Sequence, residues 1–243
     1  MRVGLLSDVH GNRLALEAVL AELDRDGVDA LVCLGDVAVG PQPRESLARV
    51  RELGCPVVLG NWDAAFLNGV PVAADETARI VNEIHAWWAD QLSHEDRDFL
   101  RTFAPSVELE LEGLPALCYH GSPRSFDDWI FATTPDDELV GMFGREHRPL
   151  LIGGHTHVQL LRRWDRASVV NPGSIGLPFA TWRPDRVRVA PWAEYAVLTS
   201  GEGGLHVDLR RACYDVAEHL RRSHASGMPH ADWWLGSWDL AIR

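Results

Sequence analysis

The order of apolar and polar positions in the first sixty residues predicts short buried strands separated by amphipathic helices. Three apolar runs have the length of strands: residues 2–6, 30–34 and 57–59. Two segments between them carry apolar residues at helical spacing: residues 13–25 and 44–53. Strands that alternate with helices in this way are typical of βαβ units, so we expect a largely parallel stretch of sheet.

The spacing of apolar residues changes after the third predicted strand, residues 57–59. Residues 75–92 have the apolar spacing of one long helix, and Ser93 and Asp96 stand three apart, as in the capping box of a further short helix. We therefore expect a helical insertion over residues 65–104.

The second half of the chain is richer in strand patterns. Residues 107–111 alternate apolar with acidic positions, which indicates a strand with one face in water. Further strands are expected over residues 114–119, 149–152, 158–162, 168–170, 195–198 and 205–209. Thr134, followed by a proline and two acids, predicts the N-cap of a helix. Helices over residues 214–225 and 229–235 are expected within a C-terminal helical segment, residues 212–243.

Composition and charge narrow the class of protein. The chain has 243 residues, of which 46% are apolar and 24% charged, as expected for a single globular domain over residues 1–243. A formal net charge of −12 argues against a broad surface that tracks nucleic-acid phosphates. A small phosphorylated ligand stays compatible with it, because a site that holds metal ions is locally positive.

Targeting patterns and cysteines favour a cytoplasmic protein. No apolar run approaches the ~18 residues of a membrane span, and the first residues lack the pattern of a signal peptide. The four cysteines, Cys33, Cys55, Cys118 and Cys213, show no paired spacing, and three of them lie in apolar runs. Buried free thiols in a reducing cytosol are therefore expected.

Polar residues that can bind a metal follow five of the predicted strands. They are Asp8 and His10, Asp36, Asn61 and Asp63, His120, and His155 and His157. Ligands of open α/β sheets sit outside the carboxyl ends of the strands, so we expect these side chains to converge.

The size of this donor set indicates more than one ion. Even without Asp63, two carboxylates, one amide oxygen and four imidazoles are too many for one tetrahedral zinc. They suit two ions in five- or six-coordinate sites completed by water. Because the set contains no thiolate, manganese, iron or zinc is favoured over copper(I).

The same motifs resemble those of a known family. They are Asp8-Val9-His10, Gly35-Asp36, Gly60-Asn61-x-Asp63, His120 and Gly154-His155-Thr156-His157. Together and in this order they resemble the calcineurin-like metallophosphoesterase superfamily, and most closely its small bacterial and archaeal phosphodiesterase branch. The resemblance implies an α/β fold, a four-layer α/β/β/α sandwich of two mixed sheets flanked by helices.

The resemblance also implies roles for single residues. Asp8, His10 and His157 would hold a first metal, Asn61, His120 and His155 a second, and Asp36 would bridge both. Asp36, Asn61 and Asp63 would be catalytic, with Asp63 orienting a neighbour such as His10 or Asn61. The implied cofactors are two divalent ions, Mn²⁺ or Fe first and Zn²⁺ or Ni²⁺ as alternatives. The implied enzyme is a dinuclear hydrolase, most closely a phosphodiesterase, in which a metal-bridging hydroxide attacks a small phosphorylated or nucleotide-like substrate.

The chain departs from the broad superfamily at Trp62, where many members have a histidine that protonates the leaving group. An indole N–H donates a hydrogen bond but cannot give up its proton in this way. Protein serine/threonine phosphatases would also have an arginine soon after residues 35–36, and this chain has none there. The candidate substrate-binding residues are Asn12, Arg13, Trp62 and Arg124, because a helix N-terminus and an arginine fork can both hold a phosphate.

Two other functions stay open. One is a dinucleoside polyphosphate hydrolase, and the other is a non-catalytic metal-binding scaffold for interactions. The expected partner is a small phosphorylated substrate, with no membrane and no extended nucleic acid. Trp233, Trp234 and Trp238 are interpreted as a C-terminal apolar anchor or as the face of a homo-oligomer.

Overall fold

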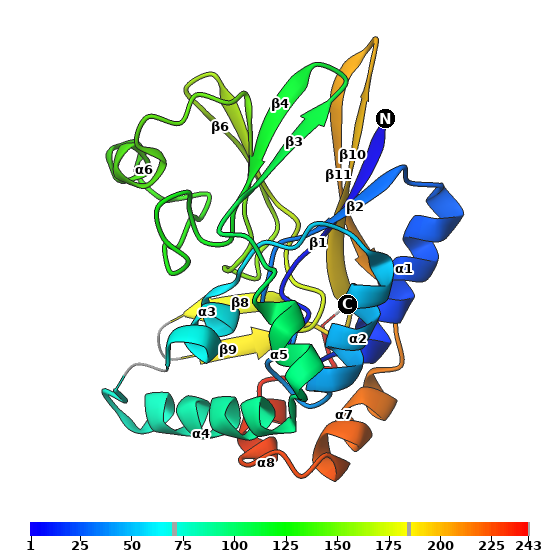
Figure 1. Ribbon diagram of the computed structural model, residues 1–243, viewed down its shortest axis with the longest axis vertical. Helices are drawn as coiled ribbons and strands as arrows, with labels where there is room; N and C mark the ends of the chain where they lie inside the picture. Colours follow the sequence, from blue (N-terminus) through cyan, green and yellow to red (C-terminus); the bar gives the residue numbers. More distant parts are fainter. Residues whose placement is uncertain (70–71, 184–185, 243) are drawn as a thin grey trace.

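The computed structural model describes residues 1–69, 72–183 and 186–242, and it contains the two mixed sheets that were predicted. The first sheet has the order β11-β10-β1-β2. Its strands are β1 (Arg2–Leu6), β2 (Ala30–Cys33), β10 (Ala193–Gly201) and β11 (Gly204–Ala212). Strand β1 is parallel to β2 and antiparallel to β10. In Figure 1, β1 runs from the N-terminus at the top towards the centre of the molecule.

The second sheet has the order β3-β4-β5-β7-β6. Its strands are β3 (Val107–Leu111), β4 (Leu114–Cys118), β5 (Leu150–Ile152), β6 (Leu160–Trp164) and β7 (Ala167–Asn171). The three central strands β4, β5 and β7 are parallel, and the two edge strands are antiparallel to them. The parallel strands of both sheets therefore direct their carboxyl ends to the loops that carry the candidate metal ligands.

Helices cover the outer faces of the two sheets. Helices α1 (Arg13–Asp26) and α2 (Pro43–Leu53) lie beside the first sheet, and α6 (Asp136–Phe143) lies beside the second (Figure 1). One apolar cluster fills the space between the sheets, including Leu5, Ile152 and Leu198. Two others lie between each sheet and its helices. Three apolar interfaces between four layers make the predicted sandwich, and they bury both faces of the parallel strands.

The region predicted as a helical insertion forms three helices: α3 (Asn61–Asn68), α4 (Glu76–Gln91) and α5 (His94–Leu100). Ser93 and Asp96 form the predicted capping box at the start of α5. The Asp96 carboxylate also accepts a hydrogen bond from Arg51 of α2 at 2.9 Å. Trp88 of α4 is fully buried, so the insertion packs onto the body of the molecule.

The C-terminal segment forms α7 (Val216–Ala225) and α8 (Ala231–Leu235) and lies next to the insertion (Figure 1). His230, just before α8, lies 2.6 Å from the Glu83 carboxylate of α4. Two strands absent from the sequence prediction, β8 (Phe179–Arg183) and β9 (Arg186–Val189), form a separate hairpin. The backbone of Val189 exchanges hydrogen bonds with Ser237 and Asp239, so this hairpin holds the end of the chain.

Three predicted local features are wrong. Residues 57–59 form isolated bridges rather than a strand, because Val57 pairs with β2 only at Cys33 while Val58 pairs with Ala104. Pro135, not Thr134, stands at the N-cap of α6, because the Thr134 hydroxyl accepts the N–H of Phe131 and closes the preceding turn. All four cysteines are free, but Cys213 is exposed.

The length and apolar character of the helices bear on whether the chain crosses a membrane. No helix formed by residues 1–69, 72–183 or 186–242 has the length and apolar character needed to cross a membrane.

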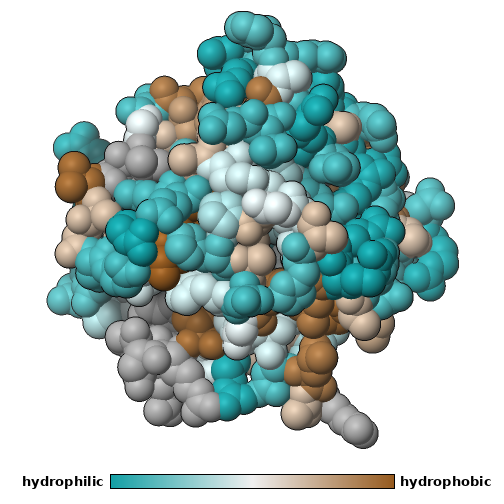
Figure 2. Space-filling view, turned by 90° about the horizontal axis from the view of Figure 1, so that it is seen from below, coloured by the Kyte–Doolittle hydropathy of each residue, from teal (hydrophilic) through white to brown (hydrophobic). Residues whose placement is uncertain are grey.

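Figure 2 views the molecule from the side of α4 and α8 and shows hydrophobic residues in small groups among hydrophilic ones. Trp233 is 44% exposed, whereas the ring of Trp238 packs 5.5 Å from His219. A homo-oligomer through this segment stays a prediction.

Candidate metal centre

The loops after β1 and β2 hold each other through their backbones. The N–H of Asp8 donates to the carbonyl of Gly35, and the N–H of His10 donates to the carbonyl of Asp36, each at 3.0 Å. Gly35 has a φ of +95°, and a Cβ there would lie 2.5 Å from the Gly60 nitrogen. Glycine is thus required where the loop after β2 passes the start of α3, and the two loops set Asp8, His10 and Asp36 side by side.

Five of the seven predicted ligands have a left-handed backbone. Asp8, His10, Asp36, His155 and His157 have φ values between 46° and 68°. Non-glycine residues adopt this conformation at a cost of about 1–2 kcal/mol each, and such positions concentrate at functional sites. The surrounding fold therefore stabilises a backbone conformation that is unfavourable by itself and that brings these five side chains together.

The seven predicted ligands, Asp8, His10, Asp36, Asn61, His120, His155 and His157, lie together and are called here the ligand cluster. Asp8, His10 and His157 form one group whose ligand atoms all lie within 4.8 Å of one another. The Asp8 Oδ1 lies 3.2 Å from the His157 Nε2, and the His10 and His157 Nε2 atoms are 3.1 Å apart. All three residues are buried. This group coincides with the predicted first metal site.

A second group combines Asp8, Asp36 and His120. The His120 Nε2 lies 3.1 Å from the Asn61 Oδ1 and 3.4 Å from the Asp36 Oδ2. The Asp36 Oδ2 also lies 3.9 Å from the His10 Nε2 of the first group, as a bridging carboxylate would. His155 is adjacent, with its ring centroid 5.1 Å from that of His120. Asp8, which was predicted for one site, belongs to both groups.

The hydrogen bonds of the imidazoles fit metal ligation. The Nδ1 of His120 lies 2.6 Å from the carbonyl of Leu34, and the Nδ1 of His157 lies 2.9 Å from that of Leu177. A carbonyl oxygen only accepts hydrogen bonds, so these contacts place N–H at Nδ1 and leave Nε2 as the ligand atom of each neutral imidazole. Both Nε2 atoms lie in the cluster, where a divalent ion would bind them.

Unpartnered buried atoms support the same conclusion. Among the described residues, Asp8 Oδ1, His10 Nδ1 and His155 Nε2 are buried without a hydrogen-bond partner. Buried polar atoms are normally paired, so a concentration of unpaired ones marks a place for a ligand or an ion. Carboxylate, amide and imidazole donors without thiolate suit Mn, Fe, Zn or Ni.

The charges of the cluster act differently on its donors: burial would lower the pKa of His120, but Asp36 and Asp8 raise it to about 10, so a metal ion there would displace a proton. Burial alone would raise the pKa of Asp8, but His157 and His10 hold it well below its ordinary value. Burial, assisted by the charge of His120, lowers the pKa of His155 to about 4. Near neutral pH, Asp8 is therefore a carboxylate and His155 a neutral imidazole, which are the forms that bind cations.

Asp63 supports the cluster in a way the sequence did not predict. Its Oδ2 accepts the N–H of Asp36 at 2.8 Å and the N–H of Gly60 at 3.1 Å. The expected partners, His10 and Asn61, are not among its hydrogen bonds. Burial, followed by the charge of Asp36, raises the pKa of Asp63 to about 7. Asp63 thus ties the loop of Asp36 to the start of α3.

A second support comes from a motif with no predicted role, residues 171–174. The side-chain amide of Asn171 donates to the carbonyl of Gly154 at 2.6 Å, just before the two histidine ligands. The Ser174 hydroxyl donates to the carbonyl of Asp8 at 2.8 Å. This motif therefore joins the loop after β5 to the loop after β1.

A cavity of about 260 Å³ lies above the ligand cluster. Its floor includes His10, Asp36, Asn61, His155 and His157. Its walls are apolar and come from distant parts of the chain: Val39, Trp62, Val81, Ile84, Trp129, Leu177, Phe179 and Trp234. Val81 and Ile84 belong to α4, so the insertion lies beside the cluster. Sequence patterns gave no sign of Trp129 or Phe179 here, and the interpretation of Trp234 as an anchor or oligomer face missed its place in the cavity.

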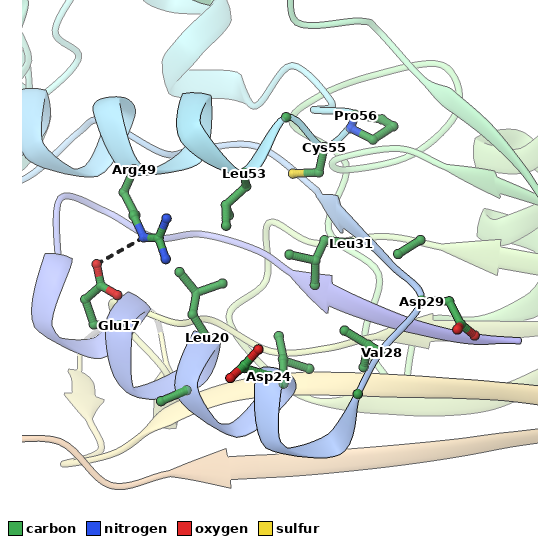
Figure 3. A pocket seen from close by; sticks show the side chains of 15 residues that line it. Glu17, Leu20, Asp24, Val28, Asp29, Leu31, Arg49, Leu53, Cys55 and Pro56 are labelled. Atoms are coloured by element: carbon green, nitrogen blue, oxygen red, sulfur yellow. Dashed lines mark hydrogen bonds and ion pairs between the residues drawn. The ribbon is translucent and has the colours of Figure 1, made fainter.

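A larger cavity, about 680 Å³, lies elsewhere, between α1, α2 and β2 (Figure 3). Its rim carries the ion pair of Glu17 and Arg49, 3.1 Å apart, and further carboxylates at Asp24 and Asp29. None of the seven predicted ligands lines it. Size alone therefore does not identify the functional cavity, and the ligand cluster does.

Three of the four candidate substrate-binding residues do not line the cavity above the cluster. The Asn12 side chain caps α1 through Ala15 and donates to the hydroxyl of Tyr214. Arg13 pairs with Glu17, and Arg124 pairs with Asp128 at 2.7 Å. The partners of Arg13 and Arg124 are local, as expected for surface residues, whereas Asn12 also links α1 to the C-terminal segment through Tyr214. Among the four, Trp62 lines the cavity, and its ring also packs against the apolar core and 5.5 Å from the ring of His85.

Comparison with known proteins gives one family and several relatives. The model of the calcineurin-like phosphoesterase superfamily domain matches residues 1–192. A metallophosphoesterase structure from Sphaerobacter thermophilus is 28% identical, covers 98% of both chains and superposes with a TM-score of 0.75. A hypothetical protein of Pyrococcus horikoshii is 24% identical over 94% of both chains, with a TM-score of 0.76. An uncharacterised protein of Methanocaldococcus jannaschii is 24% identical, over 96% of this chain and 95% of the relative.

Proposed function

Because the chain belongs to the calcineurin-like phosphoesterase superfamily, a family of metal-dependent phosphoester hydrolases, we propose that it is a dinuclear metallophosphodiesterase. Its substrate is a small phosphodiester. The observation that carries the proposal is the pair of groups that share Asp8, with the Nδ1 atoms of His120 and His157 held by carbonyls and their Nε2 atoms directed inward. Two overlapping donor sets of this kind suit two adjacent divalent ions.

Each ion has a proposed set of residues. Asp8, His10 and His157 hold the first, while Asn61, His120 and His155 hold the second, and Asp36 bridges them. Mn²⁺ or Fe is preferred, with Zn²⁺ or Ni²⁺ as alternatives, on the basis of the nitrogen and oxygen donors. Two such ions supply Lewis acidity for the phosphoryl oxygens and lower the pKa of a water molecule to produce a nucleophile near neutral pH.

The chain's own residues orient this chemistry. Asp36 is held by the N–H of Trp62, which donates to its Oδ1 at 3.0 Å, so the Oδ2 is left for the cluster. Asp63 holds the backbone of Asp36. The walls of the cavity are apolar, so the ionisable groups of its lining are those of the floor.

This chain lacks the histidine that many relatives use to protonate the leaving group. Trp62 faces the cavity where many relatives carry a histidine acid, and an indole cannot supply the proton. The enzyme should therefore prefer phosphodiesters whose leaving group departs as a stable anion, such as an aryl oxide, over alkyl phosphomonoesters.

A direct test uses purified protein and a pair of chromogenic substrates. With added Mn²⁺, hydrolysis of bis(p-nitrophenyl) phosphate should exceed that of p-nitrophenyl phosphate, and removal of metal by a chelator should abolish it. Elemental analysis should give two ions per chain. Absence of hydrolysis with Mn²⁺, Fe²⁺, Zn²⁺ and Ni²⁺ would favour the alternative of a non-catalytic metal-binding scaffold.

The second alternative, a dinucleoside polyphosphate hydrolase, has less support. All 23 basic residues of the chain are arginines, and none is among the described residues that line the cavity. A chain of several phosphates would therefore meet no positive side chain there. A nucleotide panel that includes diadenosine tetraphosphate tests this alternative directly.

A further inference from the structure

The upper part of the cavity carries four aromatic rings, Trp62, Trp129, Phe179 and Trp234, which we call the aromatic box. They come from α3, the loop after β4, β8 and α8. Four aromatic side chains around one small cavity form more flat apolar surface than a phosphate group can use. The box therefore suits a different part of the substrate.

Three of the four rings stand next to a different histidine of the ligand cluster. The Phe179 ring is 4.5 Å from that of His157, and the Trp129 ring meets His155 edge-on at 4.8 Å. The Trp234 ring is 6.3 Å from that of His10. Trp62 directly follows Asn61. A group esterified to a phosphate at the cluster would thus be surrounded by aromatic surface.

Trp234 is held in place by contacts that span the molecule. Its helix, α8, is preceded by the N-cap residue His230, which lies 2.6 Å from the Glu83 carboxylate of α4. Its other end is tied to β9, because the N–H of Val189 donates to the carbonyl of Ser237 at 2.8 Å. Trp234 lies outside residues 1–192, the part matched by the family model. This wall of the box is therefore an addition of the C-terminal segment.

Charge and volume limit what the box can hold. Among the described residues, no arginine lines the cavity, so a second phosphate would be placed against apolar walls without a cation. The volume of about 260 Å³ is small compared with the cavities that hold drug-sized ligands. A flat uncharged group on a single phosphate meets both limits.

We propose that the aromatic box binds a flat, uncharged aromatic group, of the kind found in aryl esters and nucleobases, on one side of a phosphodiester with a single phosphate. Trp234 is the residue that sets this specificity. The inference rests on the proposed phosphodiesterase function for the role of the phosphate. Stacking on the rings of the box gives the affinity, and the absence of an arginine among the described lining residues disfavours polyphosphates.

The first test measures binding without turnover. Titration calorimetry compares phenylphosphonate with methylphosphonate, using protein with and without Mn²⁺. The phenyl compound should bind roughly tenfold more tightly, as expected for stacking on one or two rings. Trp234→Leu should remove most of this preference, whereas Trp234→Phe should keep most of it. Trp233→Ala is the matched control, because Trp233 is the adjacent tryptophan of α8 and does not line the cavity.

The second test compares substrates with the same leaving group. The ratio of kcat/KM for bis(p-nitrophenyl) phosphate to that for methyl p-nitrophenyl phosphate should fall roughly tenfold in Trp234→Leu and stay unchanged in Trp233→Ala. Thermal unfolding of each variant shows whether α8 is still packed. If Trp234→Leu is unfolded, the preference for phenylphosphonate, measured in the wild-type protein and in Trp234→Phe, still tests whether the aromatic box binds an aromatic group.

The outcomes separate the two proposals. Equal binding of both phosphonates by the wild-type protein, or an unchanged substrate ratio in a folded Trp234→Leu variant, would overturn the aromatic box while hydrolysis persists. Selective phenylphosphonate binding without hydrolysis of any diester would support the box and refute the phosphodiesterase. Faster hydrolysis of diadenosine tetraphosphate than of the aryl diester would overturn the restriction to one phosphate.

Discussion

The ligand cluster and the aromatic box share one cavity but are built in different ways. Ligands such as Asp8 and His155 lie in short loops at strand ends, and these loops are joined by backbone hydrogen bonds and by the side chains of Asp63 and Asn171. The rings of the box come from segments outside the two sheets, such as α8, whose links are peripheral pairs like His230 and Glu83. In the proposed function, metal binding would therefore be a property of the central fold, whereas substrate choice would belong to the segments around it.

The largest expected effect is at the centre of the cluster. Asp36→Asn should nearly abolish turnover and reduce the metal content, because one carboxylate contacts both histidine groups. Steady-state kinetics with the aryl diester and elemental analysis measure both. Asp24→Asn, in the larger cavity of Figure 3, is the control and should change neither. Two ions and wild-type rates in Asp36→Asn would show that this residue does not bridge.

The next effect separates the two metal sites. His157→Ala should empty the first site and His155→Ala the second, so the stoichiometry should fall from two ions towards one in each variant. Turnover should fall at least about a thousandfold, because the ions act together on the phosphoryl group. Elemental analysis after dialysis measures the content. Unchanged stoichiometry in both variants would contradict the dinuclear proposal.

A substitution with a smaller expected effect on turnover would replace one ring of the aromatic box, Trp62, by a general acid. Trp62→His places a possible proton donor beside Asn61. It should raise rates on esters with poor leaving groups more than on good ones, by at most the ~10²–10⁴ of general acid catalysis. A rate series over leaving-group pKa for both proteins gives the slopes. Parallel slopes would mean that residue 62 does not control leaving-group protonation.

The smallest expected effect is on the free energy of unfolding, through the contact that joins the helical insertion to α2. Burial would raise the pKa of Asp96, but Ser93 and Arg51 lower it below its ordinary value. Asp96→Asn should therefore cost about 1 kcal/mol of unfolding free energy at pH 7, as for a helix cap. The ionised carboxylate stabilises the folded state, so the difference should disappear as the pH falls through this lowered pKa. Denaturant unfolding at pH 7 and near pH 3 measures it.

The control for that experiment is Asp98→Asn on the same helix. Asp98 is 72% exposed and pairs only along the surface with Arg101. Its loss should change stability by less than that of Asp96, because exposed ion pairs contribute little. Equal effects of the two substitutions would show that the link from Asp96 to α2 does not support the insertion.

The two regions also differ in how well the sequence predicts them. The seven ligands follow apolar runs at short fixed spacings, so the positions of Asp8 and His10 or of His155 and His157 could be predicted from local pattern alone. The two mixed sheets follow from the same pattern, together with the family resemblance. Trp129 and Trp234 have no such local context. They reach one cavity only because distant segments pack together, and tryptophan is equally common in ordinary apolar cores.

The errors in the predicted elements have similar causes. Residues 57–59 are apolar and strand-like, but the register of Val58 with Ala104 is a tertiary contact that no local pattern encodes. Asp63 was predicted to orient His10 or Asn61, but at the start of α3 its carboxylate accepts the backbone N–H groups of Asp36 and Gly60 instead. Arg124 was predicted to bind phosphate, but it has a carboxylate four residues along at Asp128.

The left-handed backbone at five of the ligands has a consequence for how this protein could change over generations. Asparagine and aspartate tolerate this conformation better than most other side chains, whereas β-branched and bulky replacements are strongly disfavoured. The easiest single steps away from Asp8 or Asp36 therefore lead to asparagine, which removes a charge and keeps the shape of the loop. A descendant could lose its metals through such steps and still inherit the sandwich intact, ready to be selected for a new purpose.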